Sequence, residues 1–181
     1  MRIIVSLCCL LALAGCADSN KMTVQSVTAK DVPIHFAYGS IKDADARYSG
    51  AESGWSGFTV RRASYRAGDE FATFDLLRSI GDYVFPRRST STYIGELLKK
   101  DMKAEWGRTG ELFGSARPTE FQSFLLPDAR ATCVGLQRPL ADHPDSSGNL
   151  PQLLLIGFYC RAGTDPIGAD EARQIAGAVH T

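Results

Sequence analysis

The chain has 181 residues, with 20 basic and 20 acidic side chains and therefore no formal net charge. Its composition, with 44% hydrophobic and 22% charged residues, is that of a folded globular domain and excludes a disordered chain, a collagen and a coiled coil. The charge balance also argues against nucleic-acid binding, since domains of that kind are usually basic. One domain is expected at this length.

The first sixteen residues have the pattern of an export signal. Arg2 precedes an apolar run over residues 3–14. The run is too short to span a bilayer, which needs about 20 residues, but it has the length of the apolar region of a secretory signal peptide. It ends in Leu13-Ala14-Gly15-Cys16, which resembles the lipobox of bacterial lipoproteins, where a leucine and two small residues precede a cysteine. The alternatives are an ordinary secretory signal with an incidental cysteine, or a buried apolar helix.

This resemblance implies that Cys16 carries a diacylglyceryl group, that residues 1–15 are removed as a signal peptide, and that Cys16 becomes the acylated N-terminus. Two or three acyl chains hold a protein stably on a membrane, whereas one does so only marginally. Ala17, in place of an aspartate after the cysteine, favours the periplasmic face of the outer membrane, although Asp18 leaves inner-membrane retention open. Residues 16–30 are then the lipidated cysteine and a flexible polar tether, and residues 31–181 form a single periplasmic domain.

The first half of this domain has weak signals for strands. Residues 32–38 are expected to form a strand that Pro33 limits to a sheet edge or a strand start, and residues 39–57 to form a long loop or short irregular elements. Residues 58–66 and 70–77 predict a hairpin, with Ala67-Gly68-Asp69 as its turn. Residues 74–85 are ambiguous between strand and helix.

An amphipathic helix is expected to follow, capped by Ser91 or Thr92 and running to Trp106, where Gly107 ends it. Its apolar positions fall four apart, at Ile94, Leu98, Met102 and Trp106.

The second half predicts three strands and a helix. The strands cover residues 118–126, 131–140 and 152–161, and the last is apolar on both faces over residues 153–159, which is typical of a central strand. A second amphipathic helix is expected over residues 169–179. This order of elements predicts an α+β domain in which two main amphipathic helices pack on an antiparallel sheet.

Cys133 and Cys160 are the two cysteines that remain once the signal peptide and Cys16 are set aside. In an oxidising compartment a disulfide is expected, and the alternatives are two buried thiols or a metal site. An antiparallel pairing that sets Cys133 opposite Cys160 also sets Gly135 opposite Phe158 and Gln137 opposite Ile156, which keeps each pair on one face of the sheet.

Catalytic templates match the sequence poorly. Gly54-Trp55-Ser56-Gly57 begins like the nucleophile turn of serine hydrolases, but Phe58 stands where the final glycine is needed. The three histidines are scattered, although His143 lies between two acids as a conceivable base. The arginine doublets at 61–62 and 87–88 are expected to be solvated surface residues, with contacts to anionic glycans or headgroups as the alternative.

We therefore expect a lipid-anchored cell-envelope protein whose domain is a non-enzymatic binding or assembly-accessory module. The alternatives are a periplasmic envelope hydrolase with a site assembled only in the folded chain, and a periplasmic inhibitor or immunity protein. The expected partners are the membrane, through the acyl chains, and an envelope protein or glycan. No nucleic acid, cofactor, metal or catalytic residue is expected.

Overall fold

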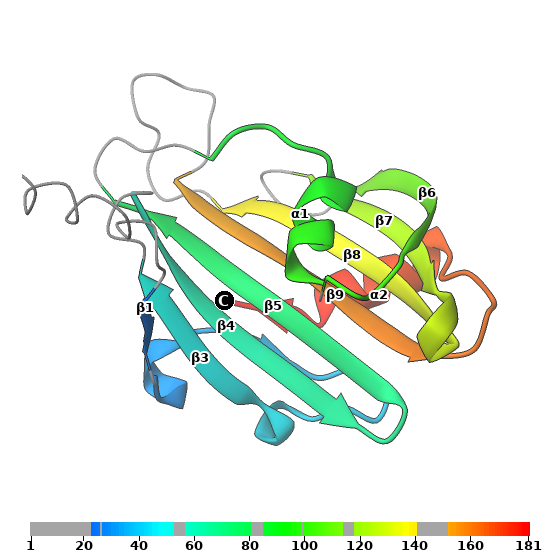
Figure 1. The fold of residues 1–181 in the computed structure, drawn as a ribbon, viewed down its shortest axis with the longest axis horizontal. Helices are drawn as coiled ribbons and strands as arrows, with labels where there is room; N and C mark the ends of the chain where they lie inside the picture. The colour runs from blue at the N-terminus through cyan, green and yellow to red at the C-terminus, as the bar shows by residue number, and fades with distance from the viewer. Residues whose placement is uncertain are drawn as a thin grey trace, which may run out of the picture.

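A computed structural model describes residues 23–25, 27–52, 57–80, 85–98, 100–113, 118–140 and 152–181. An eight-stranded antiparallel sheet with the order β1-β3-β4-β5-β9-β8-β7-β6 dominates this part of the chain (Figure 1). Its strands are Thr23–Gln25 (β1), Arg47–Glu52 (β3), Phe58–Ala67 (β4), Glu70–Ser79 (β5), Glu105–Leu112 (β6), Thr119–Leu126 (β7), Ala131–Leu140 (β8) and Leu153–Ala162 (β9). Two short strands, His35–Phe36 (β2) and Val179–His180 (β10), pair separately. The expected antiparallel sheet is confirmed, although strand outweighs helix more than an α+β label suggests.

The hairpin and the cysteine strands form where the sequence predicts them, although Ala67 belongs to β4 and the hairpin turn is therefore one residue shorter than expected. β4 and β5 pair from Ala67↔Glu70 to Phe58↔Ser79, and Gly68 takes a positive φ of 57° in the turn, a conformation that favours glycine. β8 and β9 pair with Cys133 opposite Cys160, in the expected register. β9 lies between β5 and β8, which confirms its central position.

The N-terminal part differs from the prediction. The strand expected over residues 32–38 is reduced to the two residues of β2, and the loop expected over residues 39–57 contains β3. The sequence of β3, Arg-Tyr-Ser-Gly-Ala-Glu, has little strand propensity, so its conformation comes from pairing with β4 along all six residues. β1, which falls within the expected tether, pairs with β3.

The helix expected to run to Trp106 is wrong in its length. The helix α1 covers Thr90–Leu97, and residues 105–112 form β6. Leu98 and Met102 still pack in the cluster that contains Ile94 and Phe124, and the ring of Trp106 lies 5.1 Å from that of Phe124. The four-residue spacing therefore reflects contact with one apolar cluster and not a continuous helix.

Ser89 caps α1, two residues before Ser91 and three before Thr92, the expected caps. Its hydroxyl accepts a hydrogen bond from the backbone N–H of Thr92 at 3.2 Å, which satisfies one of the free donors at the helix start. Ser89→Ala is expected to lower the unfolding free energy by about 1 kcal/mol in urea denaturation. Thr164→Ala, which removes the hydroxyl of an exposed loop residue, is the control, and an equal loss in that variant would contradict the assignment of the cap.

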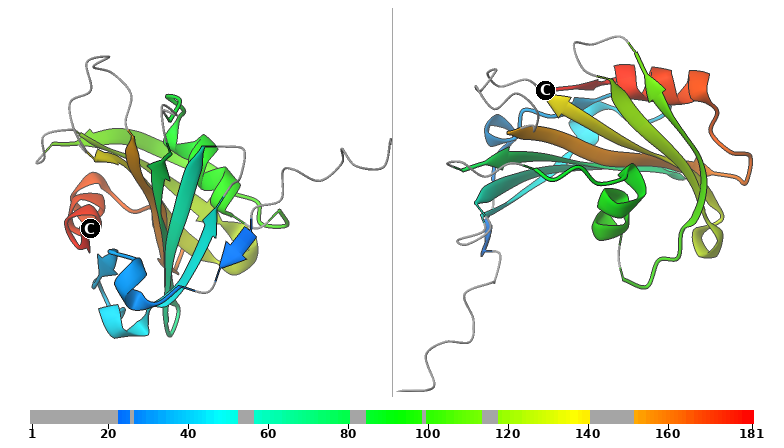
Figure 2. Two further views of the ribbon diagram at one scale, coloured as in Figure 1. Left: turned by 90° about the vertical axis from the view of Figure 1, so that its left-hand side faces the viewer. Right: turned by 90° about the horizontal axis from the view of Figure 1, so that it is seen from above.

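The two helices cover opposite faces of the sheet (Figure 2). The helix α2 spans Ala169–Gly177 and buries Ala172, Ile175 and Ala176 as predicted, while Val179 lies beyond it in β10. It packs with the 32–46 segment over the larger core, which contains Phe36, Phe74 and Tyr159 among others. The face under α1 contains two smaller apolar clusters, one of which includes both disulfide cysteines. This face also carries a pocket beside α1.

Candidate functional site

A pocket of about 550 Å³ opens beside α1, over the strands β3, β4, β5 and β9. Its size lies in the range of about 300–1,000 Å³ that is usual for sites that bind one small molecule. Side chains at alternate positions of neighbouring strands point to the same face, and this alternation places Ser49, Val60, Leu77 and Ile156 in a common wall.

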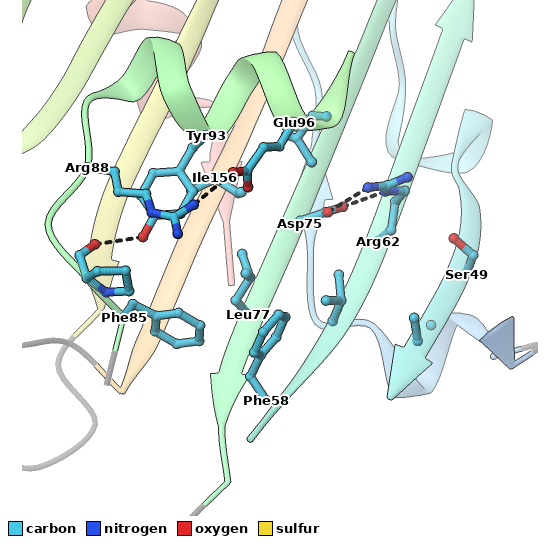
Figure 3. Close-up of a pocket in the computed structure, with 15 residues that line it drawn as sticks. Ser49, Phe58, Arg62, Asp75, Leu77, Phe85, Arg88, Tyr93, Glu96 and Ile156 are labelled. Atoms are coloured by element: carbon cyan, nitrogen blue, oxygen red, sulfur yellow. Dashed lines mark hydrogen bonds and ion pairs between the residues drawn. The ribbon is translucent and has the colours of Figure 1, made fainter. Parts of the chain in front are cut away.

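One end of the pocket is apolar. Val60 lies directly opposite Leu77 in the β4–β5 hairpin, and both are less than a tenth exposed. Phe58 and Phe85 add two rings whose centroids are 5.8 Å apart in an edge-to-face arrangement. Figure 3 shows these three large side chains, Phe58, Leu77 and Phe85, gathered at the same end.

The other end contains an ion pair between the half-exposed Arg62 and the buried carboxylate of Asp75. The Nε and Nη2 atoms of Arg62 donate to the two carboxylate oxygens of Asp75 at 2.6 and 2.7 Å. The Asp75 side chain is 5% exposed, whereas that of Arg62 is 39% exposed. Burial raises the pKa of the Asp75 carboxyl, against the opposing effect of the hydrogen bonds from Arg62, and the same bonds raise the pKa of Arg62.

A second ion pair lies on the rim, between the segment before α1 and the helix itself. Nη1 of Arg88 lies 2.7 Å from Oε1 of Glu96, and both side chains are largely exposed. The Arg88 guanidinium also lies 5.8 Å from the centre of the Tyr93 ring, within the range of a cation–π contact. The Tyr93 hydroxyl donates to the backbone oxygen of Pro86 at 2.8 Å, which ties the helix to this segment (Figure 3).

The chemistry of these residues suits recognition of a ligand with one apolar and one charged end. Both oxygens of Asp75 are engaged by Arg62, so the carboxylate is directed toward the arginine (Figure 3). Within the residues that the structure describes, no group of three or more His, Cys, Asp or Glu side chains is arranged to hold a metal ion.

The residues singled out in the sequence have different outcomes. Cys133 and Cys160 form the expected disulfide, fully buried beneath α1, with their Cα atoms 4.1 Å apart. Cys16 and the rest of the lipobox lie outside the described residues, as do Trp55 and His143.

The other histidines lie apart from the pocket. His35 contacts Asp43 at 2.8 Å in an exposed pair, and His180 lies in β10. Neither is among the residues that line the pocket.

The arginine doublets contribute to the pocket in a way that a solvated-surface interpretation does not capture. Arg62 lines the pocket, whereas Arg61 is not among its lining residues, as expected for neighbours on a strand. Arg88 lines it from the rim. The first pair depends on the length of the hairpin turn: the two-residue turn Gly68-Asp69 sets Arg62 opposite Asp75, whereas the expected three-residue turn at 67–69 would have set it opposite Phe74.

A second, smaller pocket of about 250 Å³ lies near the end of α2. Arg138 borders it and donates to the backbone oxygens of Ala176 and Val179 and to the hydroxyl of Thr119. A guanidinium that binds carbonyls at a helix C-terminus stabilises the helix end. This arginine is therefore assigned to the fold and not to a ligand site.

No family model, curated protein or solved structure gives a significant match to this chain. Among the described residues, no helix combines the length and the apolar character needed to cross a membrane.

Proposed function

We propose that this chain is a lipid-anchored cell-envelope protein whose domain binds the apolar part of a ligand in the pocket beside α1. The observation that carries the proposal is the pocket itself, because a cavity of about 550 Å³ walled by Phe58, Leu77 and Phe85 can remove a sizeable apolar group from water. Binding without chemical conversion fits the side chains present, since the acidic groups of the lining, Asp75 and Glu96, are both paired with arginines.

In this proposal the lipid anchor at Cys16 is attached close to the pocket. Thr23, the first residue of β1, is paired with Glu52 in β3, next to Ala51 of the pocket wall. The seven chain steps from Cys16 to Thr23 span at most about 24 Å. An acylated Cys16 would therefore hold the apolar end of the pocket close to the bilayer surface, where apolar ligands are concentrated.

The anchor is tested by Cys16→Ser in the full-length chain. The substitution removes the thiol that would carry the lipid, so metabolic labelling with a fatty acid is expected to disappear and the protein to leave the membrane fraction. Persistent labelling would contradict the assignment of Cys16.

The pocket is tested with a neutral apolar probe in membranes. Full-length protein is reconstituted in phosphatidylcholine vesicles that contain a hexadecanol with a photoactivatable diazirine on its alkyl chain. Illumination is expected to label peptides that line the pocket. Ala51→Trp places an indole in the cavity and is expected to reduce this labelling about tenfold, which corresponds to about 1.4 kcal/mol of lost binding.

The matched control is Ala169→Trp, because Ala169 is an exposed residue of α2 on the opposite face. This control is expected to be labelled like the wild type. Labelling spread over the whole surface, or equal in both tryptophan variants, would contradict the pocket as the binding site.

A further inference from the structure

The pocket beside α1 is chemically divided along its length. Phe58, Leu77 and Phe85 occupy one end, and the ion pairs Arg62–Asp75 and Arg88–Glu96 lie toward the other (Figure 3). We infer that the ligand is an amphiphile with a single alkyl chain and an anionic headgroup, and that Arg88 binds the headgroup. This inference rests on the proposed function, since it names the class of ligand that the same pocket takes.

The two arginines of the pocket differ in how easily they can change partner. Arg62 holds a carboxylate that is almost fully buried, and withdrawing it would leave that charge uncompensated in an apolar setting, which is costly. The Arg88 and Glu96 side chains are 44% and 60% exposed, and exposed pairs of this kind contribute little to stability. Arg88 can therefore exchange Glu96 for a ligand anion while water solvates the released carboxylate.

Arg88 is also held in position before a ligand arrives. Its guanidinium lies over the face of Tyr93, which is 4% exposed and whose hydroxyl binds the backbone of Pro86. A cation that is already placed loses less conformational freedom on binding, and its guanidinium can donate two parallel hydrogen bonds to a carboxylate or phosphate.

The local charge favours an anion over a cation. Along the segment from Phe85 to Leu98, the charged residues are Arg87, Arg88 and Glu96, which gives an excess of one positive charge at the rim. Arg87 is exposed and adjacent to Arg88, so it adds to the potential that an incoming anion meets. A cationic headgroup would have to displace Arg88 from Glu96 against this excess.

The volume of the pocket favours one alkyl chain. A space of about 550 Å³ is suited to one small ligand, and a diacyl lipid would have to leave its second chain outside. Free fatty acids and lysophosphatidic acid share the required chemistry, which is one chain that ends in an anion.

The test compares three photoactivatable probes that share one alkyl chain, in phosphatidylcholine vesicles that contain the full-length protein. The probes are palmitic acid, hexadecanol and hexadecylamine, each with a diazirine on the chain. Palmitic acid is expected to label pocket peptides about tenfold more strongly than hexadecanol, and the amine more weakly than either. One charge-assisted hydrogen bond accounts for a difference of this size.

Two substitutions assign the effect to Arg88. Arg88→Gln is expected to reduce labelling by palmitic acid about tenfold and to leave labelling by hexadecanol within about twofold of the wild type. Glu96→Gln removes the competing carboxylate and is expected to increase labelling by palmitic acid about threefold. The matched control is Arg173→Gln, because Arg173 forms a comparable exposed pair with Asp170 on the opposite face.

The outcomes separate this inference from the proposed function. If hexadecanol fails to label the pocket, the proposed function itself is wrong. If hexadecanol labels the pocket but palmitic acid does so no better, or Arg88→Gln has no selective effect, the pocket binds apolar ligands and the inference about the headgroup is wrong. Preferential labelling by the amine, lost in Glu96→Gln, would also overturn it. A lysophosphatidic acid probe distinguishes a phosphate from a carboxylate source.

Discussion

Loss of the Cys133–Cys160 cross-link is expected to lower the unfolding free energy by about 3–4 kcal/mol. The two cysteines are 27 residues apart in the sequence, and the bond removes the freedom of this loop from the unfolded chain. The loss is a large share of the roughly 5–15 kcal/mol by which a typical domain is stable. The measurement is urea unfolding of the exported protein with and without a reductant, which acts on the bond as the chain unfolds.

The double variant Cys133→Ala/Cys160→Ala separates the cross-link from packing. Both side chains are fully buried in the apolar cluster under α1, which also contains Ile94 and Phe158. The variant is expected to lose at least as much stability as the reduced wild type, because it also loses buried sulfur atoms. Its unfolding should be insensitive to the reductant. If reduction lowers the unfolding free energy of the wild type by less than a tenth of this amount, the bond does not stabilise the domain as argued.

The disulfide strands are the part of the fold that the sequence predicted best. Two long apolar runs flank residues rich in turn formers, and one register alone brings Cys133 and Cys160 together while keeping each side-chain pair on one face. The double-sided apolar run of β9 likewise placed it at the centre of the sheet. Both predictions succeeded because local pattern and long-range constraint point to the same pairing.

Where pairing outweighs local pattern, the prediction failed. β3 has a loop-like sequence and takes its strand conformation from β4, a partner that composition does not reveal. Trp106 has the spacing of a helical residue, yet it belongs to an edge strand that pairs with β7. In both cases the deciding interaction is made by residues distant in the sequence, which a local window does not contain.

The pocket is a further case of this limit. The hairpin was predicted, but the expected three-residue turn at 67–69 would have set Arg62 opposite Phe74, and the two-residue turn of the structure sets it opposite Asp75. The pair Arg88–Glu96 could not be predicted without knowing that α1 begins after Ser89 and lies over β9. This placement brings both side chains above the sheet. Neither charged pair followed from the predicted elements, because one depended on the exact length of the turn and the other on where the helix starts and packs.

Arg62→Gln is expected to lower the unfolding free energy by about 3 kcal/mol near pH 8. The substitution leaves the Asp75 carboxylate, which is 5% exposed, without the guanidinium that binds both of its oxygens. A charge that is buried without a partner destabilises the folded chain until it takes up a proton.

The dependence of the unfolding free energy on pH follows from the direction in which the pKa of Asp75 is shifted. Burial raises the pKa of this carboxyl in the folded chain above its ordinary value of 3.8, so the folded chain binds more protons than the unfolded chain between these two values. Stability therefore falls as pH rises through that window. Without Arg62 the folded pKa rises further and the window extends upward. The loss in Arg62→Gln is expected to be largest above the window and to become smaller as the pH is lowered into it, because Asp75 then takes up a proton.

Asp75→Asn is the matched control for this pair. It removes the buried charge and leaves an arginine that is 39% exposed and can be solvated, so its expected loss is about 1 kcal/mol, with no pH dependence from this site. The double variant Arg62→Gln/Asp75→Asn is expected to recover most of the stability that Arg62→Gln loses near pH 8. Urea unfolding of the four proteins at two pH values measures these differences. If Arg62→Gln and Asp75→Asn lose the same amount at both values, Asp75 is not held as a buried charge by Arg62, and the polar end of the pocket is built differently. If they differ as expected, the pair Arg62–Asp75 is a fixed part of the polar end of the pocket.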